Sequence, residues 1–168
     1  KAKERIDKMQ AEVTAYLVQL TRHQLTEPQS ELVPLLMHCT NDAERIADHT
    51  EIILQLTERL TKTNKKISEA GRKDLKKMWE VLNDQQKNVI AALGSDNPET
   101  LKFALKDQRK ISKMADKFES NHIDRLRKGN CLMANGIIFI EMLGELEKIG
   151  AHLENIAERT PEIQKHYI

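Results

Sequence analysis

The chain has 168 residues, which is enough for one or two small domains with a buried core. Its formal net charge is +1, so nothing in the overall charge favours a nucleic-acid partner. Charged residues make up 32% of the chain and aromatic residues only 4%, a composition typical of long helices with charged surfaces.

Five helices are predicted, and no strand pattern competes with them. The first spans about residues 2–24, and its apolar residues recur every three or four positions at Ile6, Met9, Val13, Leu17 and Leu20. A second apolar strip lies on roughly the opposite side, at Ala11, Ala15 and Val18. A helix with two apolar strips needs two packing partners.

The other four helices are predicted over residues 31–62, 69–93, 97–128 and 132–159. Ser30 is the expected N-cap of the first of these, and Gly94 is the expected end of the second. Asp96-Asn-Pro-Glu99 is expected to form a capping box for the third, and Thr160-Pro161 is expected to stop the fourth. No membrane-spanning segment is predicted, because the longest nearly unbroken apolar run, Cys131 to Ile140, is far shorter than the roughly 20 residues required.

One helical unit is duplicated along the chain. Residues 42–53 recur 103 positions later as residues 145–156, with five of the twelve aligned residues identical. The identical pairs are Glu44/Glu147, Ile46/Ile149, His49/His152, Glu51/Glu154 and Ile53/Ile156. Residues 5–9 also resemble residues 110–114, at an offset of 105.

The duplication predicts an all-α protein built from two three-helix units. The first and second helices match the fourth and fifth, and nothing equivalent to the third precedes the first. We therefore expect a first unit over residues 1–64 that lacks its first helix, and a complete second unit over residues 65–168. Because the chain begins with Lys1 rather than Met, we expect it to be part of a longer protein. The strip of Ala11, Ala15 and Val18 would then face the absent helix, or a second copy of the chain in a homodimer.

Three carboxylates form a stripe along the second predicted helix. Glu44, Asp48 and Glu51 are spaced i, i+4, i+7, which places them on one exposed face. A solvated acidic face is one interpretation. The other is a bound cation, because like charges at i, i+4 repel by about 0.2–0.5 kcal/mol per pair and a cation reverses that sign. Hard oxygen ligands suit magnesium, manganese or iron.

The second copy of this stripe has fewer carboxylates. Glu147 matches Glu44, but Ala151 stands where Asp48 would be, and Ser112 stands where the first helix has Asp7. If the carboxylates bind metal, the candidate ligands are Glu44, Asp48 and Asp7 in the first unit and Glu147 alone in the second.

His49 and His152 lie at the edge of the predicted helix contact, where a packing role and a ligand role are both open. Asp42 and Glu145 lie on the same edge, two turns away. Ferritin-type di-iron chemistry needs a Glu-x-x-His pair on each of two helices, and only Glu119-Ser-Asn-His122 has that spacing. No phosphate-binding glycine loop, nucleophile elbow or Cys/His cluster is present, so we predict that the protein is not an enzyme.

A basic stripe on the fourth predicted helix also has two interpretations. Its residues are Lys102, Lys106, Arg109, Lys113 and Lys117. The stripe is either a solvated face or a surface that docks on an anionic membrane or an acidic partner.

The paired motifs resemble a known family. Residues Thr40–His49 and Glu145–His152 resemble the helix signature of the PhoU family. Residues Asn121–Cys131, which lead into the second signature, resemble more particularly the PhoU-type domain that ends bacterial sodium/phosphate cotransporters. The resemblance covers nearly the whole chain apart from the expected missing helix, and it implies two tandem three-helix bundles that control phosphate uptake.

The resemblance implies a cytoplasmic domain at the inner face of the cell membrane, attached to the membrane domain of a sodium-dependent phosphate cotransporter. The alternative is a free-standing PhoU-type regulator that acts on phosphate-signalling proteins, namely an ABC transporter and a sensor kinase. A plain helical interaction module, with neither a metal nor a phosphate role, is a third class.

The resemblance also implies a surface metal, which would be iron, manganese, magnesium or zinc. Family members bind metal clusters through a Glu/Asp-x-x-x-Asp motif. That motif is intact at Glu44 and Asp48 and is broken at Glu147 and Ala151.

Overall fold

The computed structural model describes residues 2–62, 66–94, 98–129 and 133–166. These residues form five helices and no strand, which confirms the predicted all-α class. The helices are α1 (Ala2–Leu20), α2 (Glu27–Lys62), α3 (Glu69–Gly94), α4 (Pro98–Arg127) and α5 (Met133–Gln164).

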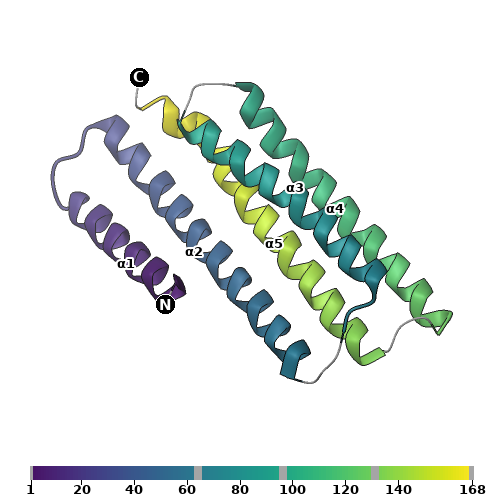
Figure 1. Ribbon diagram of the computed structural model, residues 1–168. Helices are drawn as coiled ribbons and strands as arrows, with labels where there is room; N and C mark the ends of the chain where they lie inside the picture. The colour runs from purple at the N-terminus through teal and green to yellow at the C-terminus, as the bar shows by residue number, and fades with distance from the viewer. Residues whose placement is uncertain (1, 63–65, 95–97, 130–132, 167–168) are drawn as a thin grey trace.

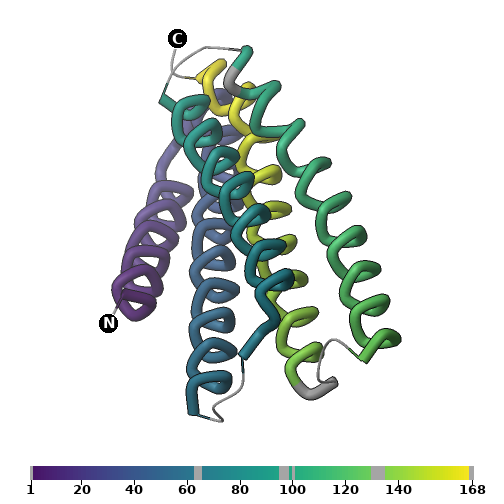
Figure 2. The backbone as a smooth tube through the Cα atoms, turned by 45° about the vertical axis from the view of Figure 1, so that its right-hand side comes forward, coloured from purple at the N-terminus to yellow at the C-terminus, as the bar shows by residue number. Residues whose placement is uncertain are grey.

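The helices form a bundle in which α2 and α5 pack side by side along the middle of the molecule (Figure 1). Helices α3 and α4 pack on each other and on α5, whereas α1 packs on α2 alone among the described helices. Figure 2 shows α1 and α4 on opposite sides of the α2–α5 pair. The pair α1–α2 thus corresponds to the pair α4–α5, as the duplication predicts. In the ranges that the structure covers, no helix is long and apolar enough to cross a membrane.

The main core lies among α3, α4 and α5. Its most buried large side chains include Met78, Ile111 and Phe139, none more than 1% exposed. Helix α2 contributes the half-buried Ile46 and Ile53 to the same core, so the helix that carries the first signature is held against the second unit. Full burial of one such side chain stabilises the fold by about 1.5–3 kcal/mol.

The start of α2 differs from the prediction. The helix begins at Glu27 because Thr26 and Gln29 form a capping box. The Gln29 N–H donates to Thr26 Oγ1 at 3.4 Å, and the Thr26 N–H donates to Gln29 Oε1 at 3.0 Å. Ser30 is therefore not the N-cap. It lies in the first turn, where its hydroxyl donates to the Thr26 carbonyl at 3.1 Å.

The ends of α1 and α5 also differ from the prediction. Helix α1 ends at Leu20, earlier than expected, and α5 continues through Pro161 to Gln164. Pro161 has no N–H for the helical ladder, but tertiary contacts hold the last turn in place. Ile163 is only 5% exposed, and the Gln164 side chain donates to the Ala92 carbonyl at 2.6 Å.

Candidate functional site

Two histidines, one from each repeat, meet where α2 and α5 pack together. The rings of His49 and His152 stack with their centroids 5.4 Å apart and their planes 22° apart. Both side chains are partly buried in the contact between the helices. The structure therefore places both histidines in the helix contact, which is the packing position weighed above.

Each histidine also binds a carboxylate of the other repeat. His49 Nδ1 lies 2.6 Å from Glu145 Oε2, and His152 Nδ1 lies 2.7 Å from Asp42 Oδ1. Because Asp42 and Glu145 are equivalent in the duplication, the two pairs form a crossed, pseudo-symmetric arrangement. The sequence offered one signal of it: in both copies an acid stands seven residues before the histidine.

In each of these two pairs, a cationic side chain also donates a hydrogen bond to the carboxylate. Arg159 donates to Asp42 Oδ2 at 2.7 Å, and Lys148 donates to Glu145 Oε1 at 2.8 Å. Burial alone would raise the pKa of Glu145, but the hydrogen bonds from Lys148 and then His49 outweigh it and lower the pKa below the ordinary value. The cluster joins the two repeats through polar contacts in a partly buried interface.

The predicted carboxylates of the first unit do come together, around a lysine. Lys3 Nζ lies 2.8 Å from Glu44 Oε1 and 2.7 Å from Asp48 Oδ1, and it also pairs with Asp7. The Lys3 side chain is 18% exposed. Hydrogen bonds to Asp48, Asp7 and Glu44 raise the pKa of Lys3 far above its ordinary value. The bond from Lys3 is also the largest cause that lowers the pKa of Asp48. An ammonium group of the chain itself therefore sits among these acids.

The second unit has no such arrangement at the equivalent place. Glu147 Oε1 accepts a hydrogen bond from Ser112 Oγ at 2.8 Å, and Ala151 stands where Asp48 would be. The offset of 105 pairs Lys3 with Gln108, which is buried. The structure thus separates Glu147 from the other three predicted ligands.

The acids of the first unit do not fit a metal ion while Lys3 stays in place. Within the described ranges, no three His, Cys, Asp or Glu side chains are arranged to hold a metal. Their oxygens are the hard donors that iron, manganese and magnesium prefer, but the ammonium of Lys3 already neutralises part of their charge. Metal binding at Glu44, Asp48 and Asp7 stays a prediction, and it requires Lys3 to move away.

The basic stripe of α4 lies on an accessible face. Lys102, Lys106, Arg109, Lys113 and Lys117 are all exposed. Phe103, which is 49% exposed, lies beside the stripe. Both interpretations of this stripe stay open.

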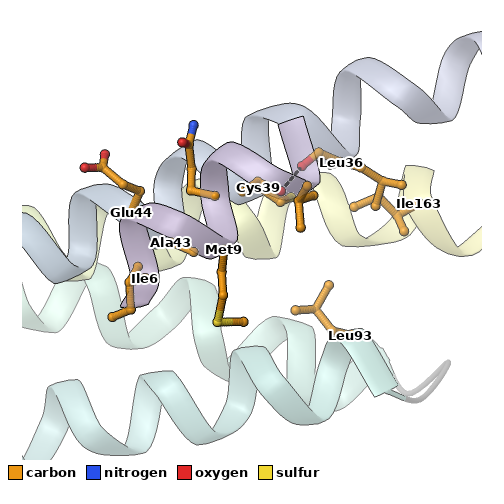
Figure 3. Close-up of a pocket in the computed structure, with 11 residues that line it drawn as sticks. Ile6, Met9, Leu36, Cys39, Ala43, Glu44, Leu93 and Ile163 are labelled. Atoms are coloured by element: carbon orange, nitrogen blue, oxygen red, sulfur yellow. Dashed lines mark hydrogen bonds between the residues drawn. The ribbon is translucent and has the colours of Figure 1, made fainter. Parts of the chain in front are cut away.

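An apolar groove lies between α1 and α2 (Figure 3). Its volume is about 580 Å³. Its lining residues are Ile6, Met9, Gln10, Val13, Leu36, Cys39, Thr40, Ala43, Glu44, Leu93 and Ile163. In Figure 3, Met9 from α1 and Leu93 from the end of α3 reach into the same space. Burial raises the pKa of the Cys39 thiol, which therefore stays protonated near neutral pH. No sequence pattern indicated this groove directly, because its shape depends on how α1 packs on α2.

Comparison with known proteins matches the chain to a protein family. A family model described as PhoU domain matches residues 1–57 and 75–160, which is well over half of the chain and includes both copies of the duplicated motif. No curated protein and no solved structure matches the chain.

Proposed function

The chain belongs to the PhoU domain family, whose members are regulators rather than enzymes, and from this premise we propose that it controls phosphate uptake. The proposed form is a cytoplasmic regulatory domain attached to a sodium-dependent phosphate cotransporter. The observation that carries the regulatory role is the family match across both repeats. The resemblance of residues 121–131 to cotransporter domains supports the attachment.

The fold is compatible with a regulator in which the two repeats change their position relative to each other. The contact between the repeats contains the crossed pairs of His49 with Glu145 and His152 with Asp42. Such polar pairs hold one relative placement of two helices only while every member is satisfied. A partner that altered the α2–α5 contact would therefore alter both units at once.

Phosphate uptake in cells that carry the full-length protein tests the proposal. Radiolabelled phosphate uptake is measured in sodium and in potassium media, before and after deletion of residues 1–168. We expect sodium-dependent uptake that no longer falls when the cells are rich in phosphate. Uptake that is independent of sodium, combined with a changed phosphate-starvation response, would favour the free-standing regulator. A deletion that leaves both unchanged would refute a phosphate role.

We also propose that the first unit binds a metal when Lys3 is displaced. Calorimetry with manganese compares the wild-type protein with three variants, and iron and zinc reconstitution serve as parallel tests. Lys3→Gln should tighten binding at least about tenfold, because it removes a positive charge from the site. Asp48→Ala should abolish most binding, and Glu147→Ala should leave it nearly unchanged. Equal losses from Asp48→Ala and Glu147→Ala, or no binding by Lys3→Gln, would refute the proposal.

A further inference from the structure

Helix α4 carries a high density of positive charge on its outer side. Eight side chains between residues 102 and 117 are exposed, and six of them are basic. Five of the six form the basic stripe described above, and Lys110 lies beside it. The other two are Phe103 and Asp116. Because the members of the stripe are three or four residues apart, they form one line about 22 Å long on one face of the helix.

This charge is not balanced by ion pairs of the kind that the other helices have. On α1, Lys8 pairs with Glu12 at 3.7 Å. On α3, three exposed lysines pair with acids of their own helix. Among the residues that the structure describes, Lys106, Lys113 and Lys117 form no such pair, although they are exposed as well. The stripe therefore differs from the solvated lysines elsewhere on this protein.

The duplication shows that the charge is particular to the second repeat. The offset of 105 pairs Arg109 of α4 with Glu4 of α1, and Lys117 with Glu12. Over residues 2–12, α1 exposes two basic and three acidic side chains, whereas the matching part of α4, residues 107–117, exposes four basic and one acidic. The same position in the fold is thus nearly balanced in one repeat and strongly basic in the other.

We propose that the basic stripe of α4 docks on the surface of a bilayer that contains anionic phospholipids. Like charges three and four residues apart repel each other along a helix, and the phosphates of a headgroup layer offset that repulsion. Helix α4 has a proline only at its first residue and lies at the edge of the bundle (Figure 2), so the whole stripe reaches a flat surface at once. The proposal rests on the charges of α4 and does not depend on the phosphate role.

Two features favour a lipid layer over an acidic protein as the partner. Four of the five residues in the stripe are lysines, whose ammonium groups act as point charges, whereas the fork of an arginine suits carboxylates in fixed positions. A fluid layer of phosphates offers charge without fixed positions. Phe103 is 49% exposed and lies next to Lys102 and one turn before Lys106. Its ring can enter the boundary between headgroups and acyl chains, where aromatic side chains are favoured.

Helix α1 offers a competing surface that is apolar but not basic. Its strip of Ala11, Ala15 and Val18 is exposed, as expected, and it lies outside the groove between α1 and α2. Glu12 stands beside this strip, and anionic headgroups repel a carboxylate. Helix α1 lies on the opposite side of the α2–α5 pair from α4 (Figure 2), so the two surfaces cannot meet one flat bilayer together. We therefore expect the contact at α4.

Flotation with lipid vesicles measures the contact. One set of vesicles is phosphatidylcholine alone, and the other is phosphatidylcholine mixed with phosphatidylglycerol. The wild-type protein should bind only the mixed vesicles, and binding should weaken as sodium chloride rises from about 50 to about 500 mM, because salt screens exposed charges. Inorganic phosphate should weaken binding no more than chloride does at equal ionic strength, which separates a headgroup layer from a site for free phosphate.

Two double variants with the same net charge separate the stripe from charge in general. Lys113→Glu with Lys117→Glu should weaken binding at least about 25-fold, because each basic residue at an anionic surface strengthens binding about fivefold. Lys8→Glu with Lys76→Glu is the matched control, since Lys8 is the counterpart of Lys113 in α1 and both control lysines are exposed. It should change binding by less than about threefold. Circular dichroism checks that both variants fold.

Tryptophan fluorescence tests which face meets the lipid. The chain has one tryptophan, Trp79 of α3, which is 54% exposed. Asn88 of α3 donates a hydrogen bond to Asp107 of α4, and Trp79, nine residues earlier, lies on the opposite side of α3. Its emission should not change when vesicles are added. Phe103→Trp in a Trp79→Phe background should instead shift to shorter wavelength with the mixed vesicles only.

Several results would overturn the proposal. One is equal binding to both sets of vesicles, or binding that salt does not weaken. Another is an equal loss of binding in the two double variants. A shift of Trp79 emission without a shift at position 103 would assign the contact to a different face. Binding of polyglutamate by the wild-type protein, lost in Lys113→Glu with Lys117→Glu and combined with no vesicle binding, would assign the stripe to an acidic protein.

Discussion

The contact between the repeats should depend strongly on Asp42. This carboxylate is 8% exposed and accepts three hydrogen bonds, from His152 at 2.7 Å, Asn155 at 3.1 Å and Arg159 at 2.7 Å. A hydrogen bond to a charged group contributes about 1.5–3 kcal/mol and a neutral one about 1 kcal/mol. Loss of one partner of a buried ion pair costs about 3–5 kcal/mol. Arg159 is 28% exposed and can turn towards water, so we expect Asp42→Ala to cost about 3 kcal/mol.

Urea unfolding followed by circular dichroism measures this cost. A loss of about 3 kcal/mol corresponds to a fall in Tm of about 6–12 °C for a chain of this size. Glu58→Ala is the matched control, because Glu58 lies on the same helix, is 69% exposed and pairs only with Lys62 among the contacts described. It should change stability by less than about 0.5 kcal/mol. A cost below about 1 kcal/mol for Asp42→Ala would refute the view that the crossed pairs hold the repeats together.

Two further predictions concern the buried His122. Burial, and then the charge of Arg125, lower the pKa of His122 below 6.5, so the unfolded chain binds its proton more readily than the folded protein does. Its contribution to the free energy of unfolding is therefore complete above about pH 6.5 and is lost as the pH falls through the folded pKa. Urea unfolding at several pH values should show this loss in the wild-type protein and a smaller loss in His122→Asn. Gly136→Ala should cost about 1–3 kcal/mol in the same assay, because a Cβ at Gly136 would lie 2.2 Å from His122 Nε2. Gly144→Ala on the same helix, where a Cβ meets nothing within 4 Å among the residues described, should instead stabilise by up to about 1 kcal/mol.

The fold was predictable because the duplication and the helical periodicity are both visible in the chain. The predictions were wrong at helix ends, where local capping and contacts with distant residues determine which residue ends the helix. Thr26 and Gln29 have the spacing of a capping box, so the start of α2 had a readable signal that Ser30 obscured. The continuation of α5 beyond Pro161 had no such signal, because it depends on the burial of Ile163 against other helices.

The candidate site was predictable in part. The i, i+4 spacing placed Glu44 and Asp48 on one face, and the structure brings Asp7 to the same place from α1. The role of Lys3 was missed, although its i, i+4 spacing from Asp7 was visible. The crossed histidine pairs could not be derived, because periodicity defines the face of each helix but not how far one helix slides along its neighbour.

The repeats differ most where one unit is covered and the other is open. In the second unit, Gln108 is 6% exposed under α3, and a Cβ on Gly150 would lie 2.2 Å from Gln108 Oε1, so glycine makes room for a buried amide. In the first unit, the equivalent positions hold Lys3 and Ala47, and the ammonium reaches partly exposed carboxylates.

The charge of Lys3 is tolerated because water still reaches its ammonium group. In the second unit, where α3 covers the equivalent position, the side chain is the neutral Gln108. Glu44 both holds Lys3 and lines the open groove. A helix that enters the groove would exclude water from this ion pair and strengthen the attraction between its charges. Occupation of the groove would therefore make Lys3 harder to displace, so helix docking and metal binding at the first unit should oppose each other.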